Sequence, residues 1–75
     1  MKTFSATDKE LWDVLRGRIK YLAMNINGLW YAFYNTPIVK DGYWEAPYST
    51  GICISNLAKI YKAKDWKKSL TRRPE

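Results

Sequence analysis

The sequence predicts an α+β domain in which one short N-terminal helix packs on an antiparallel β-meander of three to four strands. Two observations predict this class. A capping pattern followed by an apolar stripe indicates a helix near residues 8–16, and two aromatic-rich segments around an Asn-Gly pair indicate a hairpin near residues 19–35. A short turn or helix is expected close to the C-terminus. The 75 residues are expected to form a single domain over 1–75.

The predicted helix carries signals at both of its ends. Thr7 and Glu10 have the spacing of a capping box, and Gly17 follows the last helical residue as a stop. Leu11 and Trp12 lie on one apolar stripe of this helix, whereas its charged residues face outward. Because so short a helix is not stable by itself, it is expected to dock on the sheet.

The central hairpin has two open registers. A two-residue turn at Asn27-Gly28 pairs Ile26 with Leu29, whereas a type I turn with Gly28 as a left-handed bulge pairs Asn25 with Leu29. The bulged turn is slightly favoured, since the Asn25 side chain can cap it. In either register neither face of the hairpin is polar, so both faces are expected to carry other parts of the chain or a partner.

After the hairpin, short strands are expected near residues 43–45 and 51–55, and a basic tail over 59–75 with a frayed end. Asp65 is expected to cap a short turn in this tail. The residues expected to be buried are Leu11, Trp12, Leu15, Leu22, Trp30, Ala32, Ile52, Ile54 and Leu57.

The composition excludes most site chemistry. The chain has no histidine and one cysteine, and its carboxylates show no metal-ligand spacing. Cys53 lies between two isoleucines and is expected to be a buried apolar residue. We therefore expect a protein that is not an enzyme, with no catalytic residues, no metal and no cofactor. The absence of a signal peptide and of a long apolar run leads us to expect a cytoplasmic protein with no membrane partner.

The net charge of +6 is unevenly distributed. Residues 1–58 carry six basic and five acidic side chains, whereas residues 59–75 carry seven basic and two acidic ones. A basic segment with interleaved aromatic residues is typical of nucleic-acid binding, in which Tyr61 or Trp66 could stack on bases. The candidate phosphate contacts are Lys59, Lys62, Lys64, Lys67, Lys68, Arg72 and Arg73.

Two motifs occur together in this chain: K-Y-L-A-M-N-x-N-G-x-W-Y-A-F-Y-x-x-P in the hairpin and D-W-K-x-S-L near the C-terminus. This combination resembles a group of small accessory proteins encoded by tailed phages and prophages. The resemblance covers about two thirds of the chain and departs from the group's pattern at Asn25, where aspartate is commoner. It implies that the chain is the product of a phage accessory gene and acts in the cytoplasm of a bacterial host. It implies no particular activity. The matching positions are Tyr21, Ala23, Gly28, Trp30, Ala32, Trp44, Asp65, Trp66, Lys67, Ser69 and Leu70.

The preferred hypothesis is a non-catalytic module that binds a bacterial host protein or a second copy of itself, with counter-defence as one such role. It depends on a surplus of Tyr and Trp over what a small core buries. One alternative is nucleic-acid binding by the basic segment, and another is a minor structural protein of the virion. The candidate protein-interface residues are Tyr21, Tyr31, Phe33, Tyr34, Tyr43, Trp44 and Tyr48.

Overall fold

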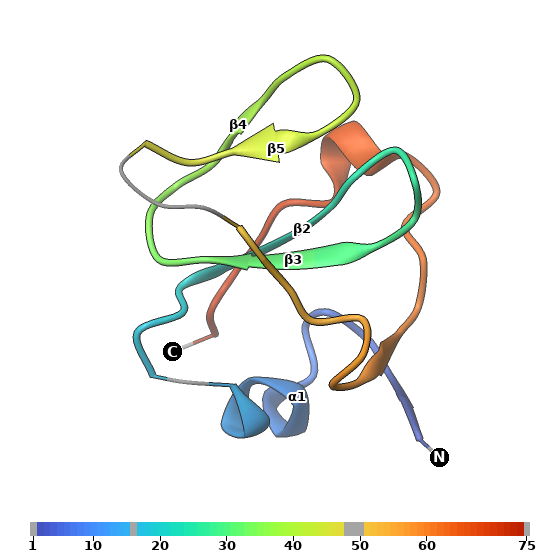
Figure 1. Cartoon of the computed structure of the whole chain (residues 1–75). Helices are drawn as coiled ribbons and strands as arrows, with labels where there is room; N and C mark the ends of the chain where they lie inside the picture. The colour runs from blue at the N-terminus through green and yellow to red at the C-terminus, as the bar shows by residue number, and fades with distance from the viewer. Residues whose placement is uncertain (1, 16, 48–50, 75) are drawn as a thin grey trace.

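A four-stranded antiparallel sheet forms the centre of the molecule (Figure 1). Its middle strands are β2 (Tyr21–Met24) and β3 (Trp30–Phe33), which form the predicted hairpin. Strand β6 (Ile52–Cys53) pairs with β3, and β8 (Thr71–Arg72) pairs with β2, so the strand order is β6-β3-β2-β8. The computed structural model describes residues 2–15, 17–47 and 51–74.

Two smaller strand pairs lie beside this sheet. Strand β1 (Thr3–Phe4) runs parallel to β7 (Lys59–Ile60), which joins the N-terminus to a segment more than fifty residues away. Strands β4 (Ile38–Val39) and β5 (Trp44–Glu45) form a second hairpin, seen at the top of Figure 1. The short strand expected near 43–45 is therefore confirmed as β5, and the one near 51–55 as β6.

The prediction of a helix on an antiparallel meander is wrong. The described residues are mostly strands and loops, with one short α-helix and three sheets. After β3 the chain does not add the next strand to the edge of the sheet; β4 and β5 pair with each other instead. The physical reason is that β2 and β3 have apolar side chains on both faces, so the second face needs a cover as much as the first.

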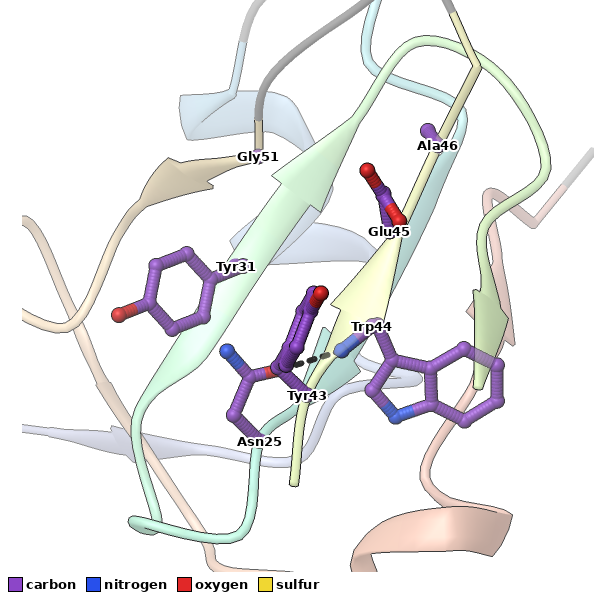
Figure 2. Close-up of a pocket in the computed structure, with 7 residues that line it drawn as sticks. All are labelled: Asn25, Tyr31, Tyr43, Trp44, Glu45, Ala46 and Gly51. Atoms are coloured by element: carbon purple, nitrogen blue, oxygen red, sulfur yellow. Dashed lines mark hydrogen bonds between the residues drawn. The ribbon is translucent and has the colours of Figure 1, made fainter. Parts of the chain in front are cut away.

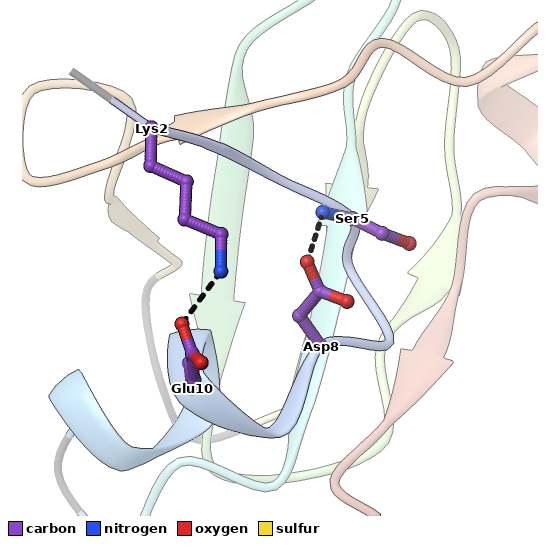
Figure 3. A network of polar contacts seen from close by, with 4 residues as sticks. All are labelled: Lys2, Ser5, Asp8 and Glu10. Atoms are coloured by element: carbon purple, nitrogen blue, oxygen red, sulfur yellow. Dashed lines mark hydrogen bonds and ion pairs between the residues drawn. The ribbon is translucent and has the colours of Figure 1, made fainter.

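Helix α1 (Lys9–Val14) is shorter than predicted, and the capping box is wrong. Asp8 occupies the N-cap position, and its carboxylate accepts a hydrogen bond from the Ser5 N–H at 2.8 Å (Figure 3). Glu10 does not reach back to the cap; it pairs with the Lys2 ammonium at 2.6 Å, and this hydrogen bond raises the pKa of Lys2. The first turn is therefore held by acidic side chains that bind the preceding segment.

The helix also ends before its predicted stop. Leu15 is extended, with φ −87° and ψ 155°, so Gly17 does not terminate the helix. Leu15 is buried, and its extended backbone leads the chain from α1 toward the central sheet. Burial of this leucine against the core therefore ends the helix earlier than the sequence signals suggest.

The bulged register of the central hairpin is confirmed. The Asn25 N–H donates to the Leu29 carbonyl at 3.0 Å, and the Gly28 N–H donates to the Asn25 carbonyl at 2.9 Å. Gly28 has a φ of +83°, the left-handed conformation that the bulge requires. Leu22 and Ala32 are consequently direct partners in the two strands.

The side chain that caps this turn is not the predicted one. Asn27 Oδ1 accepts a hydrogen bond from the Leu29 N–H at 3.0 Å, so Asn27 fixes the turn. Asn25 Oδ1 instead accepts from the Trp44 N–H at 2.9 Å. The Asn25 side chain thus ties the central hairpin to the β4–β5 hairpin.

The two faces of the central hairpin carry two separate apolar clusters. Helix α1 covers the first face, where Leu11 and Trp12 pack with Leu22 and Trp30. The β4–β5 hairpin covers the second face, where Trp44 packs with the other side of the sheet. The buried apolar residues that we did not predict are Ile19, Ala23, Met24, Phe33, Trp44 and Ala46.

Three residues predicted to be buried are exposed. Ile52 is 40% exposed, Leu57 is 66% exposed, and Cys53 is also on the surface. The two-residue strand β6 forms the edge of the sheet, so it has a neighbour on one side only. The other predicted core residues are buried as expected: Leu11, Trp12, Leu15, Leu22, Trp30, Ala32 and Ile54.

The C-terminal segment, residues 59–74, is part of the fold and not a loose tail. Ser69 is buried, and its hydroxyl accepts a hydrogen bond from the Met24 N–H and is within 3.2 Å of the Met24 carbonyl. Residues 71–72 form β8 where a frayed end was expected. Asp65 caps the 3₁₀ turn η1 (Trp66–Lys68) as predicted, by accepting from the Lys67 N–H. In residues 2–15, 17–47 and 51–74, no helix is long and apolar enough to cross a membrane.

Two glycines provide a matched test of the bulged turn. We expect Gly28→Ala to lower the free energy of unfolding by about 1–2 kcal/mol, because a β-carbon is disfavoured in the left-handed region. Gly17→Ala is the control: a β-carbon there meets no atom within 4 Å, so we expect a change within about 0.5 kcal/mol. Urea denaturation of both variants measures the difference, and equal stabilities would contradict the assigned turn.

Candidate nucleic-acid interface and aromatic cleft

The lysines of residues 59–68 alternate with apolar residues that pack inward. Ile60, Ala63 and Trp66 recur every third residue, and each packs against the core. The residues between these three anchors therefore lie on the outside of the molecule. In Figure 1 this segment runs along one side of the molecule, from β7 to η1. We name its five exposed lysines the lysine ridge: Lys59, Lys62, Lys64, Lys67 and Lys68.

The positive charge of the lysine ridge is not neutralised by neighbouring carboxylates. Within the described part of the chain, the ion pairs join Lys2 to Glu10 and Lys40 to Glu45, both outside the ridge. The acidic residue inside the segment, Asp65, uses its carboxylate to cap η1. With five lysines and one aspartate, residues 59–68 carry a net charge of +4, which is suited to a polyanion.

An exposed tyrosine lies within the ridge. The side chain of Tyr61 is 64% exposed, although its backbone is fixed at both ends. Its N–H donates to the Phe4 carbonyl at 2.9 Å, and its carbonyl accepts from the Trp30 indole N–H at 3.2 Å. The ring is thus an accessible aromatic surface on a rigid backbone.

Tyr61 borders an open pocket of about 440 Å³. The pocket is lined by Thr3, residues 28–30, Ser55 and residues 58–62, and none of these described residues is acidic. Lys62 reaches across its rim: a β-carbon at Gly28 would lie 3.3 Å from Lys62 Nζ. An ammonium group and an aromatic ring therefore border the same hollow.

The two arginines proposed as phosphate contacts have different roles. Arg72 is exposed on β8, where it lines a pocket together with Lys20. Arg73 is a structural residue: its Nε donates to the Ile19 carbonyl at 2.7 Å, and its guanidinium lies 5.1 Å from the centre of the Trp12 ring. Arg73 therefore joins α1 to the segment before β2, because its guanidinium also donates to the Trp12 carbonyl at 3.3 Å. Its contact with phosphate stays a prediction.

The candidate protein-interface residues do not form one exposed patch. Phe33 and Trp44 are buried in the same apolar cluster, with exposures of 1% and 7%. Tyr21, Tyr31 and Tyr34 are half-buried, and Tyr43 is 45% exposed. Tyr48 lies outside the described residues. The β4–β5 hairpin and η1 cover the face of the sheet where we expected the patch, which is why the prediction fails there.

A smaller aromatic cleft remains between the central sheet and the β4–β5 hairpin (Figure 2). Its volume is about 320 Å³, and Tyr31 of β3 and Tyr43 of the turn before β5 are among its lining residues. The Asn25 amide and the Glu45 carboxylate supply polar groups to the cleft. Figure 2 shows the side chains of Tyr43 and Trp44 on opposite sides of the strand. Asn25 was not predicted as a site residue, because its bond to Trp44 joins segments nineteen positions apart.

The described residues contain no group of His, Cys, Asp or Glu side chains that could hold a metal ion. No family model, no curated protein and no solved structure matches the chain. The resemblance to phage accessory proteins consequently stays a prediction.

The adjacent arginines provide a matched pair for the structural role. We expect Arg73→Ala to lower the free energy of unfolding by at least about 1.5 kcal/mol, because two partly buried hydrogen bonds lose their charged donor. Arg72→Ala, which removes an exposed side chain, should change stability by less than about 0.5 kcal/mol. Chemical denaturation monitored by Trp fluorescence measures both. A larger loss for Arg72→Ala would refute the assignment.

Proposed function

We propose that this chain is a non-catalytic nucleic-acid-binding protein that holds the phosphate backbone on the lysine ridge. The observation that carries the proposal is the ridge itself: five exposed lysines within ten residues, none of them in an ion pair in the described chain. Neutralising phosphates releases condensed counterions, which favours binding without any base-specific contact. The net charge of +6 adds long-range attraction to the same partner.

The resemblance to phage accessory proteins supplies the cellular setting of this proposal. We place the chain in the cytoplasm of a bacterial host, where phage and host nucleic acids are both present. In this proposal the protein binds nucleic acid and does not catalyse a reaction on it. The chain has no histidine, the commonest general acid or base in enzymes.

The proposal predicts a strong dependence of binding on salt. Each phosphate contact should contribute about −0.7 to −0.9 to the slope of log K against log salt concentration. The double charge reversal Lys64→Glu/Lys68→Glu should weaken oligonucleotide binding and flatten this slope by about 1.4–1.8. Fluorescence anisotropy with a labelled oligonucleotide, measured between low and physiological salt, gives both values.

A matched control separates the ridge from net charge. Arg18→Glu/Lys20→Glu makes the same change in net charge with two exposed residues in the segment 17–20, which lies on the other side of the molecule in Figure 1. We expect this control to keep the parent slope. If both double variants weaken binding equally, the ridge is not the binding surface. If the parent does not bind at low salt, the proposal is wrong.

A protein partner at the aromatic cleft is the second candidate, favoured by Tyr31 and Tyr43 beside the Asn25 amide. Tyrosine offers a large contact area with little loss of side-chain entropy, and it is common in binding surfaces. This candidate keeps the hypothesis of a host-protein partner or a homodimer but confines the contact to the cleft.

The second candidate predicts a hot spot at Tyr43. We expect Tyr43→Ala to weaken association by about 2 kcal/mol or more, while Ile38→Ala on the same hairpin has little effect. Affinity purification from nuclease-treated bacterial lysate identifies a stoichiometric partner, and size-exclusion chromatography tests self-association. Retention of the partner by both variants at equal strength would exclude the cleft.

A further inference from the structure

We infer that the nucleic acid bound by this protein is single-stranded and that Tyr61 stacks on one of its bases. This inference rests on the proposed function, which concerns the phosphate backbone, and adds the class of nucleic acid that the ridge accepts. The observation behind it is the position of an exposed aromatic ring within the lysine ridge.

Tyr61 is the most exposed aromatic residue in the described part of the chain, followed by Tyr43 at 45%. Tyr61 is 64% exposed, whereas Trp12, Trp30 and Trp44 are each less than 10% exposed. No hydrogen bond of the Tyr61 hydroxyl and no ring contact is found for it in the described residues. An aromatic ring of this exposure has little role in packing, so its ring is accessible to a ligand.

The backbone of Tyr61 is fixed by hydrogen bonds, so the ring has a defined position on the surface. Strand β7 ends immediately before it, and hydrogen bonds to Phe4 and from Trp30 fix the peptide groups on both sides. A base that stacks on the ring therefore binds a surface whose position is set by the core. Because the site is already ordered, less conformational entropy is lost when a base binds.

The surroundings of Tyr61 fit a nucleotide. Lys59 and Lys62 flank the ring in the sequence and can contact the phosphates on either side of a stacked base. The adjoining pocket of about 440 Å³ has Leu29 and Ala58 among its lining residues, which gives it an apolar wall. A ring, an apolar wall and two ammonium groups are the combination found in single-strand binding sites.

The same geometry disfavours a duplex. Bases inside a duplex are already stacked on both sides and cannot place a face on an external ring. A duplex could use the lysines alone, and it would lose the contribution of Tyr61. Stacking of a base on an aromatic side chain contributes about 1–3 kcal/mol, which corresponds to about 5- to 150-fold in affinity.

The test compares the full chain and three variants on two probes at low salt. The probes are a labelled oligothymidylate and a duplex of equal length, with anisotropy as the readout. We expect Tyr61→Ala to weaken binding of the single strand by about 5- to 150-fold and to leave binding of the duplex unchanged. Tyr61→Phe should keep the parent affinity, because stacking needs the ring and not the hydroxyl.

The third variant, Lys64→Glu/Lys68→Glu, separates this inference from the proposed function. It should weaken binding of both probes, since both carry phosphates. If Tyr61→Ala binds the single strand as the parent does, the inference is overturned while the proposed function stands. If neither probe binds the parent, both are overturned. Circular dichroism and thermal melting confirm that each variant is folded, and Tyr61→Ala is expected to melt with the parent because its ring is exposed.

Discussion

The apolar character of both faces of the β2–β3 hairpin is the constraint on which the rest of the structure depends. With Leu22 and Trp30 on one face and Ala23 and Phe33 on the other, neither face can be left in water. Helix α1 covers the first face, and the β4–β5 hairpin covers the second. The edge strands β6 and β8 are short, because the chain runs from the central sheet to the covering segments and back.

The C-terminal segment holds these layers together. Trp66 packs against both apolar clusters, and its carbonyl accepts a hydrogen bond from the Trp44 indole N–H at 3.0 Å. Ser69 binds the backbone of Met24, and Arg73 binds carbonyl groups of Trp12 and Ile19. These contacts explain why the segment is ordered although it is rich in charge. The residues of this segment that contact the core point inward, and the lysines lie between them on the surface.

This arrangement links stability to the proposed function. The residues that fix the segment to the core also determine where the lysine ridge lies and hold the backbone of Tyr61 in place. An interface of this kind is preorganised, so little conformational entropy is lost when a ligand binds. The aromatic cleft depends on a similar tie, since Asn25 fixes the second hairpin that forms one of its walls.

Some parts of the candidate site could be predicted from the sequence because they depend on local signals. The excess of lysine in residues 59–75 is a matter of composition, and the exposure of Tyr61 between Lys59 and Lys62 follows from the spacing of the neighbouring apolar residues. The role of Arg73 could not be predicted, since its partners, Ile19 and Trp12, are more than fifty positions away. The burial of Phe33 was missed for the same reason, because the cover comes from β4–β5.

The sequence by itself determined the elements whose physics is local. The Asn-Gly turn, its left-handed Gly28 and the Asp65 cap all depend on neighbouring residues. Of the two registers that the sequence left open, the structure has the slightly favoured one, which pairs Leu22 with Ala32. Tertiary structure alone decided where α1 ends, which strands form the central sheet and which aromatic rings remain accessible. The reason is that burial is shared between distant segments. Leu15 is buried in the core outside the helix, and β8 pairs with β2 two residues after Ser69, which is hydrogen-bonded to Met24.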